Sequence, residues 1–127
     1  MKSIFFISLF LISCNLVGQT KNINSIVFFG CWVDSREENE ADSKISIYRP
    51  CDYKEFPQSR FRFKMVLRPD YSCSWLYLAP NDGHKLIEGK WYFDKEKSIL
   101  KILNLRGGLV KRFNIEEIEK DKMSIKN

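Results

Sequence analysis

The strongest constraint on the fold of this chain is a strict alternation of apolar and basic side chains in the stretch 60–68. Only Val66 interrupts the basic set. The apolar positions are occupied by Phe61, Phe63, Met65 and Leu67. Successive side chains of a β-strand point to opposite faces, so this pattern predicts a strand with one buried and one solvated face. Pro69 and Asp70 then turn the chain.

Other short apolar runs follow along the chain, separated by turn residues. Asn81-Asp82-Gly83 favours a tight hairpin, because these residue types tolerate the positive φ angles that such turns need. In the strand that follows, Ile87, Trp91 and Phe93 share the face that we expect to lie inward with the apolar side of 60–68. Strands are expected over 25–33, 44–49, 60–68, 72–78, 86–93, 98–105, 109–115 and 122–126.

Short links between about eight such strands predict an all-β fold. We expect an up-and-down antiparallel meander, curled into a small barrel or half-barrel, because closure removes the exposed edges of a sheet. Aromatic residues make up 14% of the chain and alanine occurs only twice, and both features favour strands over helices. The length of 127 residues allows a single domain.

Residues 1–18 have the pattern of an export signal. Lys2 precedes the apolar run 4–12, which suits the hydrophobic region of a signal peptide. This run is too short to span a bilayer, for which about 20 apolar residues are needed. Residues 19–24 then form a polar tether, and residues 25–127 form the β domain.

Two cleavage sites stay open. Leu11-Ile12-Ser13-Cys14 has the form of a lipobox, in which the signal ends before Cys14 and this cysteine is lipidated. A lipidated Cys14 would attach the domain to a membrane without a helix that crosses it. Ordinary cleavage would instead fall near Gly18-Gln19, which lacks the usual pattern of small residues. We favour the lipobox, and with it a location in the cell envelope.

The net charge of +5 is unevenly distributed, because acidic residues are concentrated in the stretch 33–57 and the remainder is basic. In an exported protein, we expect the acidic partners of such a surface to be envelope polymers or lipid headgroups, and no nucleic acid.

Three cysteines follow the export signal, and an oxidising compartment allows one disulfide among them. In a simple meander, Cys31 near the end of the first strand and Cys73 at the start of the fourth lie at one end of the sheet, and Cys51 lies at the other. We therefore expect Cys31–Cys73 to be the only pair that can meet, the alternative being three unpaired thiols. The absence of CxxC and of a histidine near any cysteine argues against a zinc site, and no cofactor is expected.

Two short motifs carry a resemblance to a known family. Gly30-Cys31-Trp32 and Gly89-Lys90-Trp91 have the Gly-x-Trp form of lipocalins. The stretch 61–126 resembles the small lipocalin-like domains of bacterial envelope proteins, in which a strand, a Pro-Asp turn and a Gly-x-Trp strand precede three short strands. The resemblance implies an antiparallel barrel with a ligand site at its mouth.

The candidate ligand-binding residues are of two kinds. The first are aromatic and either pack in the core or line a ligand site: Trp32, Trp75 and Trp91. The second, Arg62 and Lys64, belong to the basic side of the stretch 60–68. They either form a solvated face or, if this side turns toward a cleft, bind a carboxylate or an anionic headgroup.

No catalytic constellation stands out. His84 is the only histidine, and adjacent glutamates such as Glu37 and Glu38 do not form an acid–base pair by sequence alone. We therefore expect a non-enzymatic binding module for a small apolar or amphipathic molecule. The alternative is an envelope interaction protein with a filled core, which binds a protein or an anionic polymer through an edge strand or the basic stripe. A continuous apolar cavity of about a few hundred Å³ would separate the two.

Overall fold

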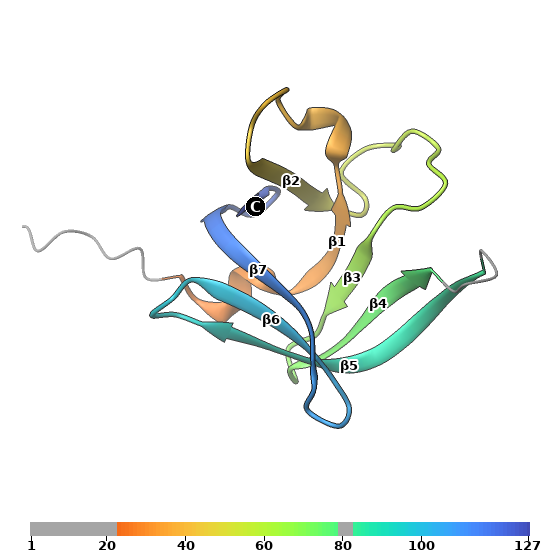
Figure 1. Cartoon of the computed structure of the whole chain (residues 1–127). Helices are drawn as coiled ribbons and strands as arrows, with labels where there is room; N and C mark the ends of the chain where they lie inside the picture. The colour runs from red at the N-terminus through yellow and green to blue at the C-terminus, as the bar shows by residue number, and fades with distance from the viewer. Residues whose placement is uncertain (1–22, 79–82) are drawn as a thin grey trace, which may run out of the picture.

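A computed structural model describes residues 23–78 and 83–127 of the chain (Figure 1). The predicted export signal 1–18 with Cys14, most of the predicted tether 19–24, and Asn81 and Asp82 of the expected hairpin turn lie outside the described residues. The described residues form eight strands and two short 3₁₀ helices. In chain order these are η1 (Ser25–Phe28), β1 (Gly30–Asp34), η2 (Arg36–Glu38), β2 (Ile45–Pro50), β3 (Lys64–Leu67), β4 (Ser72–Leu78), β5 (His84–Asp94), β6 (Ile99–Asn104), β7 (Leu109–Ile118) and β8 (Met123–Lys126).

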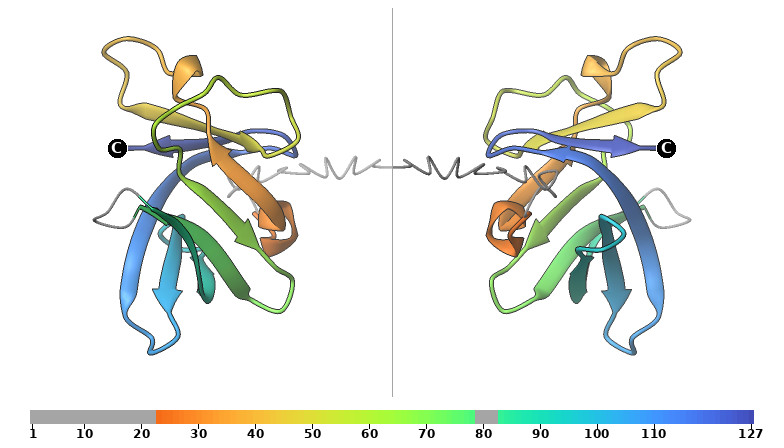
Figure 2. Two further views of the ribbon diagram at one scale, coloured as in Figure 1. Left: turned by 90° about the vertical axis from the view of Figure 1, so that its right-hand side faces the viewer. Right: turned by 90° about the vertical axis from the view of Figure 1, so that its left-hand side faces the viewer.

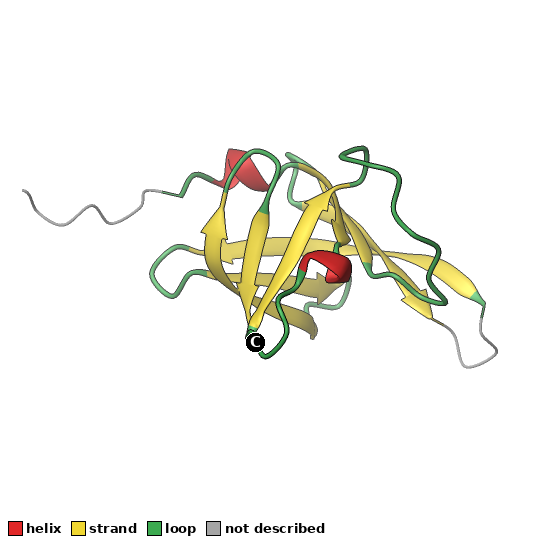
Figure 3. Cartoon of the chain, turned by 90° about the horizontal axis from the view of Figure 1, so that it is seen from above, coloured by secondary structure: helices red, strands yellow, loops and turns green. Residues whose placement is uncertain are grey.

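The strands close into an antiparallel barrel, which confirms the expected all-β meander barrel (Figure 2). Each strand from β3 to β8 pairs with the next one along the chain. The first two strands depart from the simplest order, because β1 lies between β2 and β3, and β2 closes the ring by pairing with β8. The β4–β5 hairpin extends outward from the ring (Figure 3).

The first strand begins later than the sequence predicts. Residues 25–28 form η1, which begins where the side chain of Asn24 accepts a hydrogen bond from the backbone N–H of Ile26. Gly30 then has a φ of 124°, a conformation that side-chain-bearing residues rarely adopt. The expected strand 60–68 is also shorter than predicted, since only Lys64–Leu67 pair as β3.

This late start explains why the predicted Cys31–Cys73 disulfide is wrong. Cys31 is bonded to Cys51 instead, with 5.4 Å between their Cα atoms. Because β1 begins at Gly30, Cys31 lies at its start, and the antiparallel β2 brings its own end, and therefore Cys51, to the same place. The N–H of Cys51 donates to the carbonyl of Cys31 at 3.1 Å.

Cys73 is a free, buried thiol on the inner face of the barrel. Cys31 precedes the inward-facing Trp32 on its strand, so its own side chain points to the outer face, away from Cys73. Burial raises the pKa of the Cys73 thiol to about 11, which keeps it protonated and unreactive near neutral pH.

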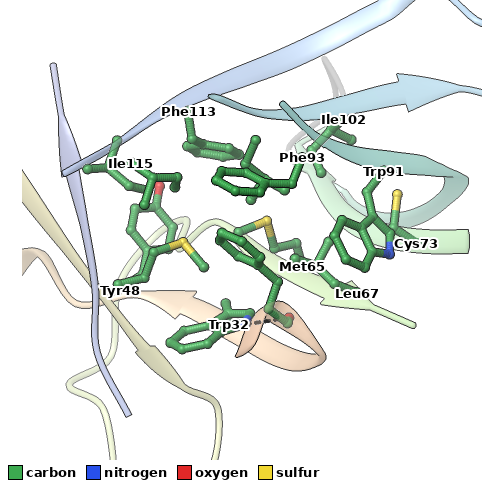
Figure 4. Packing of buried hydrophobic residues seen from close by; sticks show 14 of the residues in the cluster. Trp32, Tyr48, Met65, Leu67, Cys73, Trp91, Phe93, Ile102, Phe113 and Ile115 are labelled. Carbon is green, nitrogen blue, oxygen red and sulfur yellow. Dashed lines mark hydrogen bonds between the residues drawn. The ribbon is translucent and has the colours of Figure 1, made fainter. Parts of the chain in front are cut away.

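Large side chains fill the interior (Figure 4). The alternation within 60–68 is confirmed at Met65 and Leu67, which are fully buried, while Phe63 and Ile87 pack partly buried against the same cluster. Phe28 of η1 is also fully buried and packs on Phe93, with 4.6 Å between ring centroids. The buried members of the cluster are Phe28, Trp32, Tyr48, Met65, Leu67, Cys73, Trp75, Trp91, Phe93, Leu100, Ile102, Phe113, Ile115, Met123 and Ile125.

The close approach of β5 to Trp75 makes Gly89 sensitive to substitution. A Cβ at this position would lie 2.5 Å from Cζ3 of Trp75 and would collide with the carbonyl of Leu103. We expect Gly89→Ala to lower the free energy of unfolding by about 2–3 kcal/mol, because backbone on one side and a buried indole on the other prevent relaxation. Urea unfolding measures this, with the exposed neighbour Lys90→Ala as control. A loss below about 0.5 kcal/mol, the usual effect of a surface substitution, would contradict the tight packing at Gly89.

The disulfide should be a main source of stability in this small barrel. It closes a loop with a sequence separation of 20, for which chain-entropy arguments give about 3 kcal/mol. We expect the double variant Cys31→Ser/Cys51→Ser to lose about this much in urea unfolding. Mass mapping under non-reducing conditions should also find the peptides of Cys31 and Cys51 linked and that of Cys73 alone. A linked peptide that contains Cys73 would refute the assignment.

Candidate functional site

The three predicted tryptophans are all buried. The indole N–H of Trp32 donates to the carbonyl of Phe28 at 2.9 Å, and that of Trp91 donates to the carbonyl of Arg68 at 2.9 Å. Trp75 packs against the backbone at Gly89. Their main role is therefore to fill the interior of the barrel and to stabilise its packing. Of the three, only Trp32 and Trp91 also line one of the surface hollows found among the described residues.

The two predicted basic residues do not come together in a cleft. The guanidinium of Arg62 pairs with the carboxylate of Glu37 and donates to the backbone carbonyls of Asp34 and Pro57, each at 2.8 Å. Lys64 is exposed on the outer side of β3. The donors of Arg62 are thus already used to hold the loop after β1 and the loop before β3 together.

Four hollows formed by described residues all open to solvent. Two of them, of about 800 and 420 Å³, share Tyr71 and Trp91 and lie side by side on the outside of the barrel. Tyr92 lines the larger hollow and Leu105 the smaller one. We call these two hollows and the aromatic residues Tyr71, Trp91 and Tyr92 the aromatic groove. Together these two hollows expose a larger volume than either of the other two.

The turn between β3 and β4 sets the position of Tyr71. Tyr71 has a φ of 65°, in the left-handed region that disfavours residues with a Cβ. Its N–H donates to the carbonyl of Arg68, and its own carbonyl accepts from the N–H of Trp91 at 2.9 Å. These bonds hold the Tyr71 ring against the indole of Trp91, with 5.1 Å between the ring centroids.

Charged and polar groups surround this aromatic floor. The residues that contribute them are Ser25, Asp70, Ser72, Lys90, Asp94, Lys95 and Glu96. Asp70 stabilises the turn itself, since its carboxylate accepts from the hydroxyl of Ser72 at 2.6 Å and from its N–H at 2.9 Å. These bonds lower the pKa of Asp70, so it stays charged at the edge of the groove.

A second polar cluster, which sequence analysis missed, lies where β1 ends and β7 begins. Lys111 pairs with the inward-facing Ile102 and places its ammonium 3.9 Å from the ring centroid of Phe63. Partial burial lowers the pKa of Lys111, whose side chain stays partly exposed, and raises that of the half-buried Asp34, which also faces inward. The alternation of Lys111, Phe113 and Ile115 along β7 was the signal that could have revealed this inward lysine. None of the four hollows reaches Lys111, so the aromatic groove is the stronger site.

Searches of protein-family models, curated proteins and solved structures found no match to this chain. The function of this chain therefore has to be inferred from its own geometry. The described residues contain no group of histidine, cysteine and carboxylate side chains that could hold a metal ion. Within the same residues, no helix is both long and apolar enough to cross a membrane.

The ion pairs of Arg62 with Glu37 and of Arg49 with Glu38 predict a dependence of stability on pH. Hydrogen bonds from Arg62 and Arg49 lower the pKa values of Glu37 and Glu38 from the ordinary 4.5 to about 2. A carboxylate with a lowered folded-state pKa contributes stability that is complete above its unfolded value and is lost as the pH falls toward the folded value. Urea unfolding at pH 6 and pH 3 should therefore show lower stability at about pH 3.

The double variant Glu37→Gln/Glu38→Gln tests the origin of this dependence. It should flatten the change in stability between about pH 4.5 and pH 2. Asp34 acts in the opposite direction because its pKa is raised, so Asp34→Asn should make the dependence steeper. An unchanged profile in the double glutamine variant would show that these ion pairs do not couple to folding.

Proposed function

We propose that this protein is an exported, non-enzymatic binding module with a lipocalin-like barrel, and that it holds a small apolar or amphipathic molecule in the aromatic groove. The observation that carries the proposal is the conformation of Tyr71. A left-handed φ at a residue with a Cβ costs about 1–2 kcal/mol, and glycine or asparagine would occupy this position at less cost. Tyr71 is a large aromatic residue, and its ring is half exposed beside Trp91. The strain of this conformation is therefore better explained by a role of the ring in ligand binding than by a role in stabilising the fold.

The chemistry of the groove favours an amphipathic ligand. Aromatic rings provide a flat apolar surface with little rotamer freedom to lose on binding. Charged groups at the rim, among them Lys90, Asp94 and Lys95, can orient a polar end of the ligand. A hollow of about 800 Å³ has the size of small-molecule sites.

The groove replaces the barrel lumen as the proposed ligand site. The interior is occupied by the buried cluster, whose aromatic members Phe28, Trp91 and Phe93 pack directly under the groove. Binding on the outside of a filled barrel therefore needs no rearrangement of the core. We place the protein in the cell envelope on the basis of its N-terminal sequence.

An interaction protein that uses an edge strand or the basic stripe is less well supported. Closure leaves few free strand edges; they include the outer part of the β4–β5 hairpin, where Leu76–Leu78 have no partner in β3 and His84–Glu88 have none in β6. Two arginines of the stripe are engaged in ion pairs, Arg62 with Glu37 and Arg68 with Glu88, which leaves less of it for an anionic polymer.

The variant Tyr71→Asn tests the proposal. Asparagine tolerates the left-handed conformation, so the relief of strain should offset the lost ring contact and leave the free energy of unfolding within about 1 kcal/mol of wild type. Binding of a fluorescent fatty acid, followed by fluorescence titration and displaced by unlabelled fatty acid, should weaken at least about ten-fold.

A matched control is Tyr77→Thr, which removes a tyrosine of similar exposure, 45% against 48% for Tyr71, outside the groove. This variant should bind the probe like wild type. The proposal fails if wild type shows no saturable binding, or if Tyr71→Asn and Tyr77→Thr bind equally well.

A further inference from the structure

Apolar side chains stay exposed around the aromatic groove and on the short helix beside it. Ile26 of η1 is 62% exposed and Leu105 is 67% exposed, and Tyr92 is also exposed. Both η1 and Leu105 border the groove, because Ser25 of η1 lines the larger hollow with Tyr71 and Tyr92, and Leu105 lines the smaller hollow with Tyr71. Single exposed apolar residues are normal on protein surfaces, whereas a contiguous group marks an interaction surface.

The structure of η1 explains why this face cannot bury its own apolar residues. Phe28 points into the barrel and is fully buried, and Phe29 packs edge-on against Trp91 at 5.9 Å. A helix of four residues that buries Phe28 leaves Ile26 and Val27 on the side that faces away from the barrel. Polar residues at these two positions would leave the contacts of Phe28 with the core unchanged.

The chain that precedes the described residues joins the molecule at this same face. The described part begins at Ile23, next to η1, so the residues that precede it in the exported protein are attached here. If Cys14 is lipidated, Asn24 is the tenth residue after it. Ten steps along the chain span at most about 36 Å, so the barrel would be held close to the bilayer with this face nearest to the attachment point.

We infer that this face of the barrel, with Ile26, Val27, Tyr71, Tyr92 and Leu105, is a membrane-contact surface that rests in the interfacial layer of a lipid bilayer. Tyrosine is enriched at the depth of lipid headgroups, where its ring is apolar and its hydroxyl is hydrated. Aliphatic side chains such as Ile26 and Leu105 would reach slightly deeper.

The charges around the groove specify the kind of lipid. Lys90 and Lys95 are nearly balanced by Asp70, Asp94 and Glu96. A nearly neutral surface gains little from anionic headgroups, so contact should occur on zwitterionic phosphatidylcholine and change little with salt. The inference goes beyond the proposed function and does not require that the groove hold a separate ligand.

Hydrogen–deuterium exchange on the full chain bound to phosphatidylcholine vesicles tests this inference. Peptides that cover 23–29 and 90–95 should exchange at least about three-fold more slowly with vesicles than without them, because bilayer contact excludes water from their backbone. The protection should persist at high salt. It should be lost in Ile26→Ser/Val27→Ser even when the N-terminal segment still holds the chain on the vesicle.

The control is Leu86→Ser, which removes an equally exposed apolar side chain, 60% against 62% for Ile26, on the outer face of β5 away from the groove. It should keep the protection. Urea unfolding of Ile26→Ser/Val27→Ser should match wild type, which shows that the variant is folded whether or not the groove binds a fatty acid. Equal exchange with and without vesicles would overturn the inference. Concentration-dependent protection without vesicles would also overturn it and would point to a second copy of the chain as the occupant.

Discussion

Closure of the ring between β2 and β8 is the constraint on which the rest of the structure depends. Once eight short strands close, their inward side chains must fill the interior, because a packed core tolerates few voids. Aromatic and sulfur-containing side chains provide the volume, among them Trp32, Met65 and Phe113. Closure also removes most of the edges by which an open sheet would pair with other chains, except along the outer part of the β4–β5 hairpin. A binding surface therefore has to form on the outside, where turns and the ends of strands meet.

Much of the barrel could be predicted from the sequence, because strand periodicity is a local property. The alternation that ends at Met65 and Leu67 identified inward positions correctly, and the residues around 81–83 correctly separated two strands that pair as β4 and β5. The run 25–33 was predicted less well. It is apolar throughout and carries no periodicity, so the sequence did not distinguish η1 from the strand that begins at Gly30. The wrong cysteine pairing follows from this one boundary.

The candidate site was harder to predict than the fold. Trp91 was identified, but its neighbour Tyr71 was not, because the exposure of that ring depends on a single φ angle in the turn. Arg62 was also identified as a site residue, yet its acidic partner Glu37 lies 25 residues away in sequence and is brought to it only by the pairing of β1 with β3. Contacts of this kind depend on the closed topology, which residue patterns do not specify in detail.

The unpaired thiol inside the barrel has a consequence for the order of events during folding. The bond between Cys31 and Cys51 joins neighbouring strands, so it can form while most of the chain is still open. Pairing of β2 with β8 joins segments far apart in sequence, and such contacts form slowly. Until then Cys73 is within reach of an oxidant or a competing sulfhydryl, and afterwards the wall of strands shields it. The time during folding at which Cys73 stops reacting with a thiol reagent therefore reports the time at which the barrel closes.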